Sequence, residues 1–150
     1  MAEAQTFTQM KEDMKDAMRA KAADRLGTIR MLISSLQNKQ IDLKRDLTEA
    51  DIVSVLATEA KKRREASESF RDNGREELAD KEDYELTVIE GYLPAQLNED
   101  DVAAIIDEIM ASTGATAKSD MGKVMGPLMS LIKGQFDGGK ARNILMSKLN

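Results

Sequence analysis

Apolar residues recur at spacings of three and four through almost the whole chain, and this rhythm limits the possible folds more than any other feature. Such spacing is typical of one buried face of an α helix. The composition agrees, because only 3% of the residues are aromatic and the chain has two prolines, as in proteins built mainly of helix-forming residues. The sequence therefore predicts an all-α protein. The clearest example is the series Leu26, Ile29, Ile33, Leu36 and Ile41.

Residues that start and stop helices divide the chain into seven helical segments. Capping boxes are predicted at Thr6 with Gln9, at Thr48 with Asp51 and at Asn98 with Asp101, and single N-caps at Asp24, Ser119 and Asp137. Asn73-Gly74 and Gly114 are expected to end helices. The predicted helices cover about 7–20, 24–45, 48–73, 75–90, 99–113, 119–134 and 138–149.

The clearest interruption is the segment Leu93-Pro94-Ala95-Gln96-Leu97, because proline moves the residue before it out of the helical region. We place a domain boundary there. Residues 1–93 are predicted to form an N-terminal helical domain built on a long helical hairpin, and residues 94–150 a small three-helix bundle.

The residue types that are absent restrict the chemistry. The chain has no cysteine and no histidine, which excludes thiol nucleophiles, imidazole bases and most zinc sites. No phosphate-binding loop is present, and we expect neither a cofactor nor a bound metal. The only catalytic candidates are Lys118 paired with Ser119 or Ser112, and adjacency alone is weak support for them. No apolar window is long enough to span a membrane and no signal peptide is recognisable, so a cytoplasmic protein is expected.

One predicted helix, residues 119–134, has two glycines one turn apart and then a proline: Gly122, Gly126 and Pro127. Each glycine costs about 1 kcal/mol relative to alanine, and an interior proline about 3 kcal/mol. A segment that needed only to be helical would not carry all three. We expect another helix or a ligand to approach this backbone closely, and the sequence does not choose between the two.

Charge is distributed unevenly along the chain, whose net charge is −5. Residues 47–93 hold 13 acidic and 7 basic groups, whereas residues 114–150 hold 6 basic groups and only Asp120 and Asp137. Because nucleic-acid binding depends on the local field, the C-terminal segment is a candidate phosphate-binding surface. Its candidate residues are Lys118, Gly122, Lys123, Gly126, Lys133, Gly134, Lys140 and Arg142.

A second basic cluster, Lys61-Lys62-Arg63-Arg64, lies in the third predicted helix. It is either a solvated face neutralised by Glu59, Glu65 and Glu68 at helical spacings or a second strip that contacts phosphates. The first interpretation is favoured, because such patches are generally weak.

Several short motifs stand out along the chain. The most specific are Y-L-P-A-Q-L at residues 92–97 and M-G-K-V-M-G at residues 121–126. The others are I-R-M-L at 29–32, S-L-Q-N at 35–38, E-A-K-K-R-R at 59–64 and K-G-Q-F-D at 133–137. Together they resemble the GatB/YqeY family nearly from end to end, closest to the free-standing bacterial proteins of that family.

This resemblance implies a C-terminal domain shared with the tail of the B subunit of the glutamine-dependent tRNA amidotransferase, where the tail helps to hold tRNA. It also implies the family-level description of carbon–nitrogen ligase activity with glutamine as amide donor. The amidase and kinase centres of that enzyme lie outside the shared tail, and nothing in this chain replaces them. The implied partners are tRNA and either an amidotransferase or an aminoacyl-tRNA synthetase.

Two functions from different classes therefore remain. The first is a tRNA-binding accessory protein that uses the C-terminal cations. The second is a protein–protein adaptor without RNA binding, which the ten methionines favour because methionine-rich surfaces adapt to varied partners.

Overall fold

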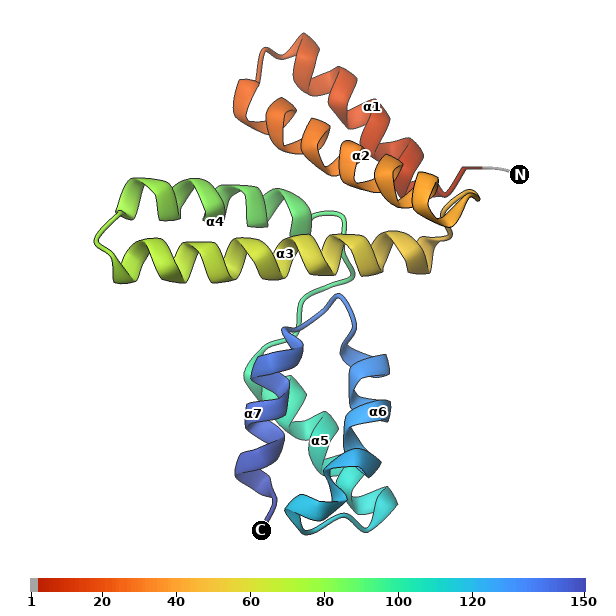
Figure 1. Cartoon of the computed structure of the whole chain (residues 1–150), viewed down its shortest axis with the longest axis vertical. Helices are drawn as coiled ribbons and strands as arrows, with labels where there is room; N and C mark the ends of the chain where they lie inside the picture. Colours follow the sequence, from red (N-terminus) through yellow and green to blue (C-terminus); the bar gives the residue numbers. More distant parts are fainter. Residues whose placement is uncertain (1–2) are drawn as a thin grey trace. The chain divides into compact units, whose positions relative to one another are not determined.

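The computed structural model describes residues 3–150, and these form seven α helices, one short 3-10 turn and no strand (Figure 1). The all-α prediction is confirmed. The chain divides into two compact units, Met1–Leu93 and Pro94–Asn150, which are described separately. The elements are α1 (Gln5–Arg19), α2 (Ala23–Leu43), α3 (Glu49–Asp72), α4 (Glu76–Glu90), α5 (Glu99–Thr113), η1 (Lys118–Asp120), α6 (Met121–Ile132) and α7 (Gly138–Lys148).

The first unit consists of two helical hairpins, α1 with α2 and α3 with α4 (Figure 1). Their apolar faces meet in one core, and Tyr92 and Leu93 pack against it at the end of the unit. The hydroxyl of Tyr92 donates to the Asp13 carboxylate at 2.6 Å, and burial together with this bond raises the pKa of Tyr92. The fully buried side chains of the core are Phe7, Met10, Ile29, Leu32, Leu36, Ile52, Leu56 and Ile89.

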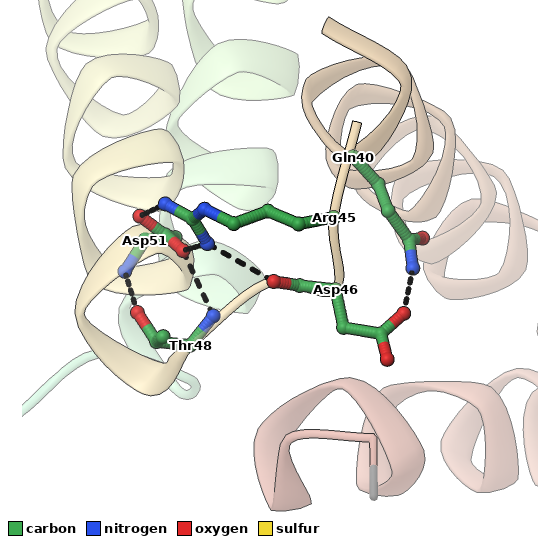
Figure 2. A network of polar contacts seen from close by, with 5 residues as sticks. All are labelled: Gln40, Arg45, Asp46, Thr48 and Asp51. Carbon is green, nitrogen blue, oxygen red and sulfur yellow. Dashed lines mark hydrogen bonds and ion pairs between the residues drawn. The ribbon is translucent and has the colours of Figure 1, made fainter. Parts of the chain in front are cut away.

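The start of α3 is fixed by the network that Figure 2 shows. Thr48 and Asp51 form the predicted capping box, in which the Asp51 amide donates to the Thr48 hydroxyl at 3.1 Å and the Thr48 amide donates to the Asp51 carboxylate at 2.8 Å. Arg45 donates to the same carboxylate at 2.6 Å and to the Asp46 carbonyl at 3.0 Å. The hydrogen bond from the guanidinium holds the pKa of Asp51 well below its usual range.

The predicted capping box at Thr6 is wrong. Helix α1 begins after Ala4, without a side-chain cap of its own. Thr6 lies inside the helix, and its amide and hydroxyl donate to the Glu49 carboxylate of α3 at 2.9 and 2.6 Å. The start of α1 is thus capped by a side chain 43 residues away in the sequence, which a local pattern cannot reveal.

Three further predictions for the first unit need correction. Asp24 is not an N-cap but lies in the first turn of α2. Ile41 is 71% exposed, because it follows Leu36 by five residues and points about 140° away from it at 100° per residue. Leu78 is 39% exposed, and its neighbour Ala79 occupies the buried position instead.

The second unit packs α5, α6 and α7 around one apolar core. The predicted capping box at Asn98 and Asp101 is present, and Asp137 caps α7 by accepting from the Lys140 amide at 3.0 Å. The N-cap predicted at Ser119 is wrong, since Ser119 lies in η1 and α6 begins only at Met121. The core of this unit contains Val102, Ile106, Ile109, Val124, Leu128, Ile132, Ala141, Leu145 and Leu149.

Among residues 3–150, no helix combines the length and apolar character needed to cross a membrane.

The capping box of α3 leads to a first prediction. Replacing Thr48→Ala removes the acceptor for the Asp51 amide, and we expect a loss of about 1 kcal/mol in the free energy of unfolding. Urea unfolding followed by tyrosine fluorescence is the measurement, because Tyr84 and Tyr92 both lie in the first unit. The control is Thr58→Ala, at an exposed mid-helix site where the hydroxyl only bonds to the Ser54 carbonyl of its own helix. Equal stability of the two variants would contradict the expectation.

Candidate nucleic-acid interface

The cations of the second unit differ in whether a carboxylate neutralises them. Lys148 pairs with Asp107 at 2.9 Å, and Lys123 pairs with Asp120 at 3.4 Å. The other four are exposed. Within residues 3–150, no carboxylate oxygen lies within the 4.0 Å limit of an ion pair from their charged nitrogens. We call these four residues the free cations: Lys118, Lys133, Lys140 and Arg142.

Most acids of this unit belong to α5, which carries none of the free cations. Residues 94–150 carry 6 basic and 7 acidic groups, so the unit as a whole is not basic. Five of the acids belong to α5, and all five lie at exposed positions. Asp120 and Asp137 accept backbone amides, Asp120 from Thr116 and Ala117 and Asp137 from Lys140. Basic character is therefore local to η1, α6 and α7.

The structure does not gather the free cations at one point. Lys118 precedes α6 and Lys133 follows it, and a helix of 12 residues is about 18 Å long. Lys140 and Arg142 flank the buried Ala141 and lie about 200° apart around α7. Contacts from all four would have to extend over a surface rather than converge on one small anion.

The outward face of α6 lies opposite its buried residues Val124, Leu128 and Ile132. It carries Gly122, Lys123, Gly126 and Ser130, all of which are exposed. A Cβ added at Gly122 or Gly126 would meet no atom within 4 Å outside its chain neighbours and its own helix backbone. Within the second unit no other helix packs against these glycines, so the expected close approach of a neighbouring helix is not seen there.

Helix α6 continues through Pro127 to Ile132, and the break that proline often causes does not divide it. Proline has no amide hydrogen to donate to the carbonyl of Lys123, four residues earlier. Lys123 thus stays on the same continuous helix as Gly126, whereas Lys133 lies just beyond the end of that helix.

Two other glycines do have local reasons within the unit. Gly134 is buried and has a φ of +76°, a conformation that favours glycine. At Gly138 an added Cβ would lie 3.2 Å from the Met129 sulfur, so the start of α7 packs closely on α6. The candidate residue Gly134 is thus explained by the backbone turn that it forms, and it does not lie on an open face.

The cluster at residues 61–64 is neutralised by carboxylates within the first unit. Arg63 is only 7% exposed, contacts Glu59, and lies 3.5 Å from Glu85 across the α3–α4 pair. Its neighbours also have carboxylate partners: Lys61 with Glu65 at 4.0 Å, Lys62 with Glu59 at 3.5 Å and Arg64 with Glu90 at 3.7 Å. The cluster is not a continuous strip of free cations, and Arg63 is part of the interior.

Sequence reasoning missed the role of two glutamines. Gln96 donates to the Gly134 carbonyl at 2.8 Å, and Gln135 donates to the Ala95 carbonyl at 3.1 Å. Both residues lie inside motifs that the sequence had singled out, Y-L-P-A-Q-L and K-G-Q-F-D. The only hint of this contact in the sequence was that each of the two motifs contains a glutamine.

The different environments of the glycines give a second prediction. Replacing Gly122→Ala should raise the stability of the second unit by up to about 1 kcal/mol, since the added methyl meets open space on a helix. The matched change Gly134→Ala should lower it, because its positive φ strains any residue with a Cβ. Helical circular dichroism during thermal unfolding measures both. A destabilised Gly122→Ala protein would show that the face is not open.

Comparison with known proteins places the chain in a family. The family model described as Yqey-like protein matches residues 7–149. Altered inheritance of mitochondria protein 41, mitochondrial, from Pyrenophora tritici-repentis is 30% identical over 129 residues, covering 84% of this chain and 70% of that protein.

The proteins of the same name from two yeasts match less of this chain. The one from Kluyveromyces lactis is 39% identical over 87 residues, covering 57% of this chain and 47% of that protein. The one from Lachancea thermotolerans is 40% identical over 88 residues, covering 56% of this chain and 46% of that protein. The chain thus spans about half the length of these yeast relatives. The match to the family model extends over the helices of both units, and the chain belongs to the Yqey-like protein family.

Proposed function

We propose that this chain is a tRNA-binding accessory protein, related in function to the tail domain of the glutamine-dependent aspartyl/glutamyl-tRNA amidotransferase. The observation that carries the proposal is the set of four free cations on η1, α7 and the turn after α6. Exposed cations without carboxylate partners attract phosphates, and binding releases the counterions held by the nucleic acid.

The spread of the free cations suits a polyanion better than a small anion. Lys118 and Lys133 lie at opposite ends of α6, so a bound molecule must present negative charge over about the length of that helix. Contacts of this kind position the nucleic acid without reading its bases. Lys123 would add a contact on the open face of α6 once its weak, exposed pair with Asp120 is displaced.

The aromatic content of the second unit favours folded RNA over single strands. Its only aromatic residue is Phe136, which is half-buried and packs against the core. Proteins that bind single strands stack bases on exposed aromatic rings, and this surface offers none in the described residues. Recognition of RNA shape through the sugar–phosphate backbone is consistent with such a surface, and tRNA is a folded RNA of that kind.

The proposal assigns no chemical step to the chain. Carbon–nitrogen ligase activity would belong to a partner, either an amidotransferase or an aminoacyl-tRNA synthetase, that acts on the bound tRNA. We place this role in the cytoplasm. The name of the fungal relatives includes the word mitochondrial, which concerns those proteins.

A second candidate function is a protein–protein adaptor, and one observation favours it. In the second unit Leu131 is 57% exposed and Met146 is 37% exposed, and both could contact a partner protein. Affinity capture from bacterial lysate distinguishes the two functions. One defined protein that stays bound after nuclease treatment supports the adaptor, whereas recovery of tRNA that nuclease removes supports the accessory protein.

The salt dependence of tRNA affinity tests the proposal. We expect the affinity of the whole chain for total tRNA to fall steeply with salt, and Lys133→Ala to reduce the slope of log K against log salt by about 1. The matched control is Lys39→Ala, which removes the same charge from an exposed position of the first unit and should leave the slope unchanged.

Two results would contradict the proposal. One is the absence of tRNA binding at low salt. The other is an equal effect of the Lys133 and Lys39 changes, since it would show that only the total charge matters and not the surface of the second unit.

A further inference from the structure

The turn that carries Lys133 is held by a segment almost 40 residues earlier in the sequence. The Leu97 amide donates to the Gln135 carbonyl at 2.8 Å. The Gln96 side chain donates to the Gly134 carbonyl at 2.8 Å, and the Gln135 side chain donates to the Ala95 carbonyl at 3.1 Å. We call these three hydrogen bonds the clamp.

The clamp acts on a turn that would otherwise have few restraints. Lys133 is exposed and lies between the last residue of α6 and Gly134. On its N-terminal side Ile132 is buried and its carbonyl accepts the Gln135 and Phe136 amides at 2.8 and 3.2 Å. On its C-terminal side the clamp fixes the Gly134 carbonyl. These hydrogen bonds therefore hold the backbone on both sides of Lys133 in a single conformation.

A mobile lysine would lose conformational freedom when it contacts a phosphate, and that loss lowers affinity. A lysine whose backbone is already fixed loses less. The clamp also joins the turn to the Ala95–Leu97 segment, which directly follows Pro94, the first residue of the second unit.

We propose that Gln96 and Gln135 are positioning residues for phosphate contact by Lys133, a role that rests on the proposed function. Neither side chain carries charge, so the loss of either should leave the salt dependence of binding unchanged. Because the clamp and the Lys133 contact stabilise each other, bound RNA strengthens the clamp by the same factor by which the clamp strengthens binding.

A double-mutant cycle with total tRNA at low salt tests this role in the full chain. Gln96→Ala should raise Kd roughly three- to tenfold, about the effect of one lost hydrogen bond, without changing the salt slope. In a Lys133→Ala background the same change should alter Kd by less than about twofold, because the residue that it positions is gone. Combined with Lys118→Ala, at the other end of α6, its effect should be additive. Gln37→Ala, an exposed glutamine of α2, is the matched control and should leave Kd unchanged.

Hydrogen exchange provides a readout that does not depend on affinity. In the free protein, the Leu97 amide should exchange faster in Gln135→Ala than in the parent chain. Addition of tRNA should slow its exchange in the parent chain but not in Lys133→Ala.

The outcomes separate the inference from the proposed function. If the parent chain does not bind tRNA, or if Lys133→Ala has no effect, the proposed function fails and the positioning role fails with it. If Lys133→Ala weakens binding but Gln96→Ala does not, or if their effects simply add, the positioning role alone is overturned. Unchanged circular dichroism of the Gln96→Ala protein ensures that a lost clamp is not confused with a lost fold.

Discussion

The pairing of cations with carboxylates is the interaction that joins α3 to α4 in the first unit. In the first unit Arg63 is buried against Glu59 and Glu85 and so joins α3 to α4. Removal of one partner from such a buried group leaves an uncompensated charge, which is strongly destabilising. Arg71 also joins these helices, through Asp80 and Asp83, although more exposed pairs contribute little each.

In the second unit the corresponding carboxylates are committed elsewhere. Asp120 and Asp137 accept the backbone amides that order η1 and start α7, and the remaining acids belong to α5. The free cations of η1, α7 and the turn after α6 are exposed and have no carboxylate partner among the described residues. A local field arises in this way on a protein whose net charge is −5, and the proposed function follows from this local field.

Local patterns predicted the fold well because the interactions that set helix ends are local. The boxes at Thr48 and Asn98 each join residues three apart, and they were confirmed. Prediction failed at Thr6, where the competing acceptor Glu49 is 43 residues away. Whether a cation is paired with a carboxylate was equally hard to predict from sequence. Lys148 is paired only because the fold brings Asp107 beside it. Sequence identified the basic segment, but only the tertiary structure shows which of its members are free.

The glycine-bearing segment shows both what the sequence could predict and what only the tertiary structure reveals. Its glycines were expected to admit either a helix or a ligand, and within the second unit no neighbouring helix packs against Gly122 or Gly126. Gly134 and Gly138, by contrast, have structural roles in the turn and in the packing of α7 on α6. Spacing along the sequence could not separate these two kinds of glycine, because the difference depends on which atoms lie across from each Cα.

The central claim is that the free cations of the second unit bind tRNA. It is tested most directly by replacing Lys118, Lys133, Lys140 and Arg142 together with glutamine and measuring tRNA binding at low salt by gel shift. The account predicts that this protein keeps its helical circular dichroism and loses tRNA binding. A parallel protein, in which the paired cations Lys61, Lys62, Arg64 and Lys148 are replaced by glutamine, should retain most of its binding. Undiminished binding by the first protein would contradict the account.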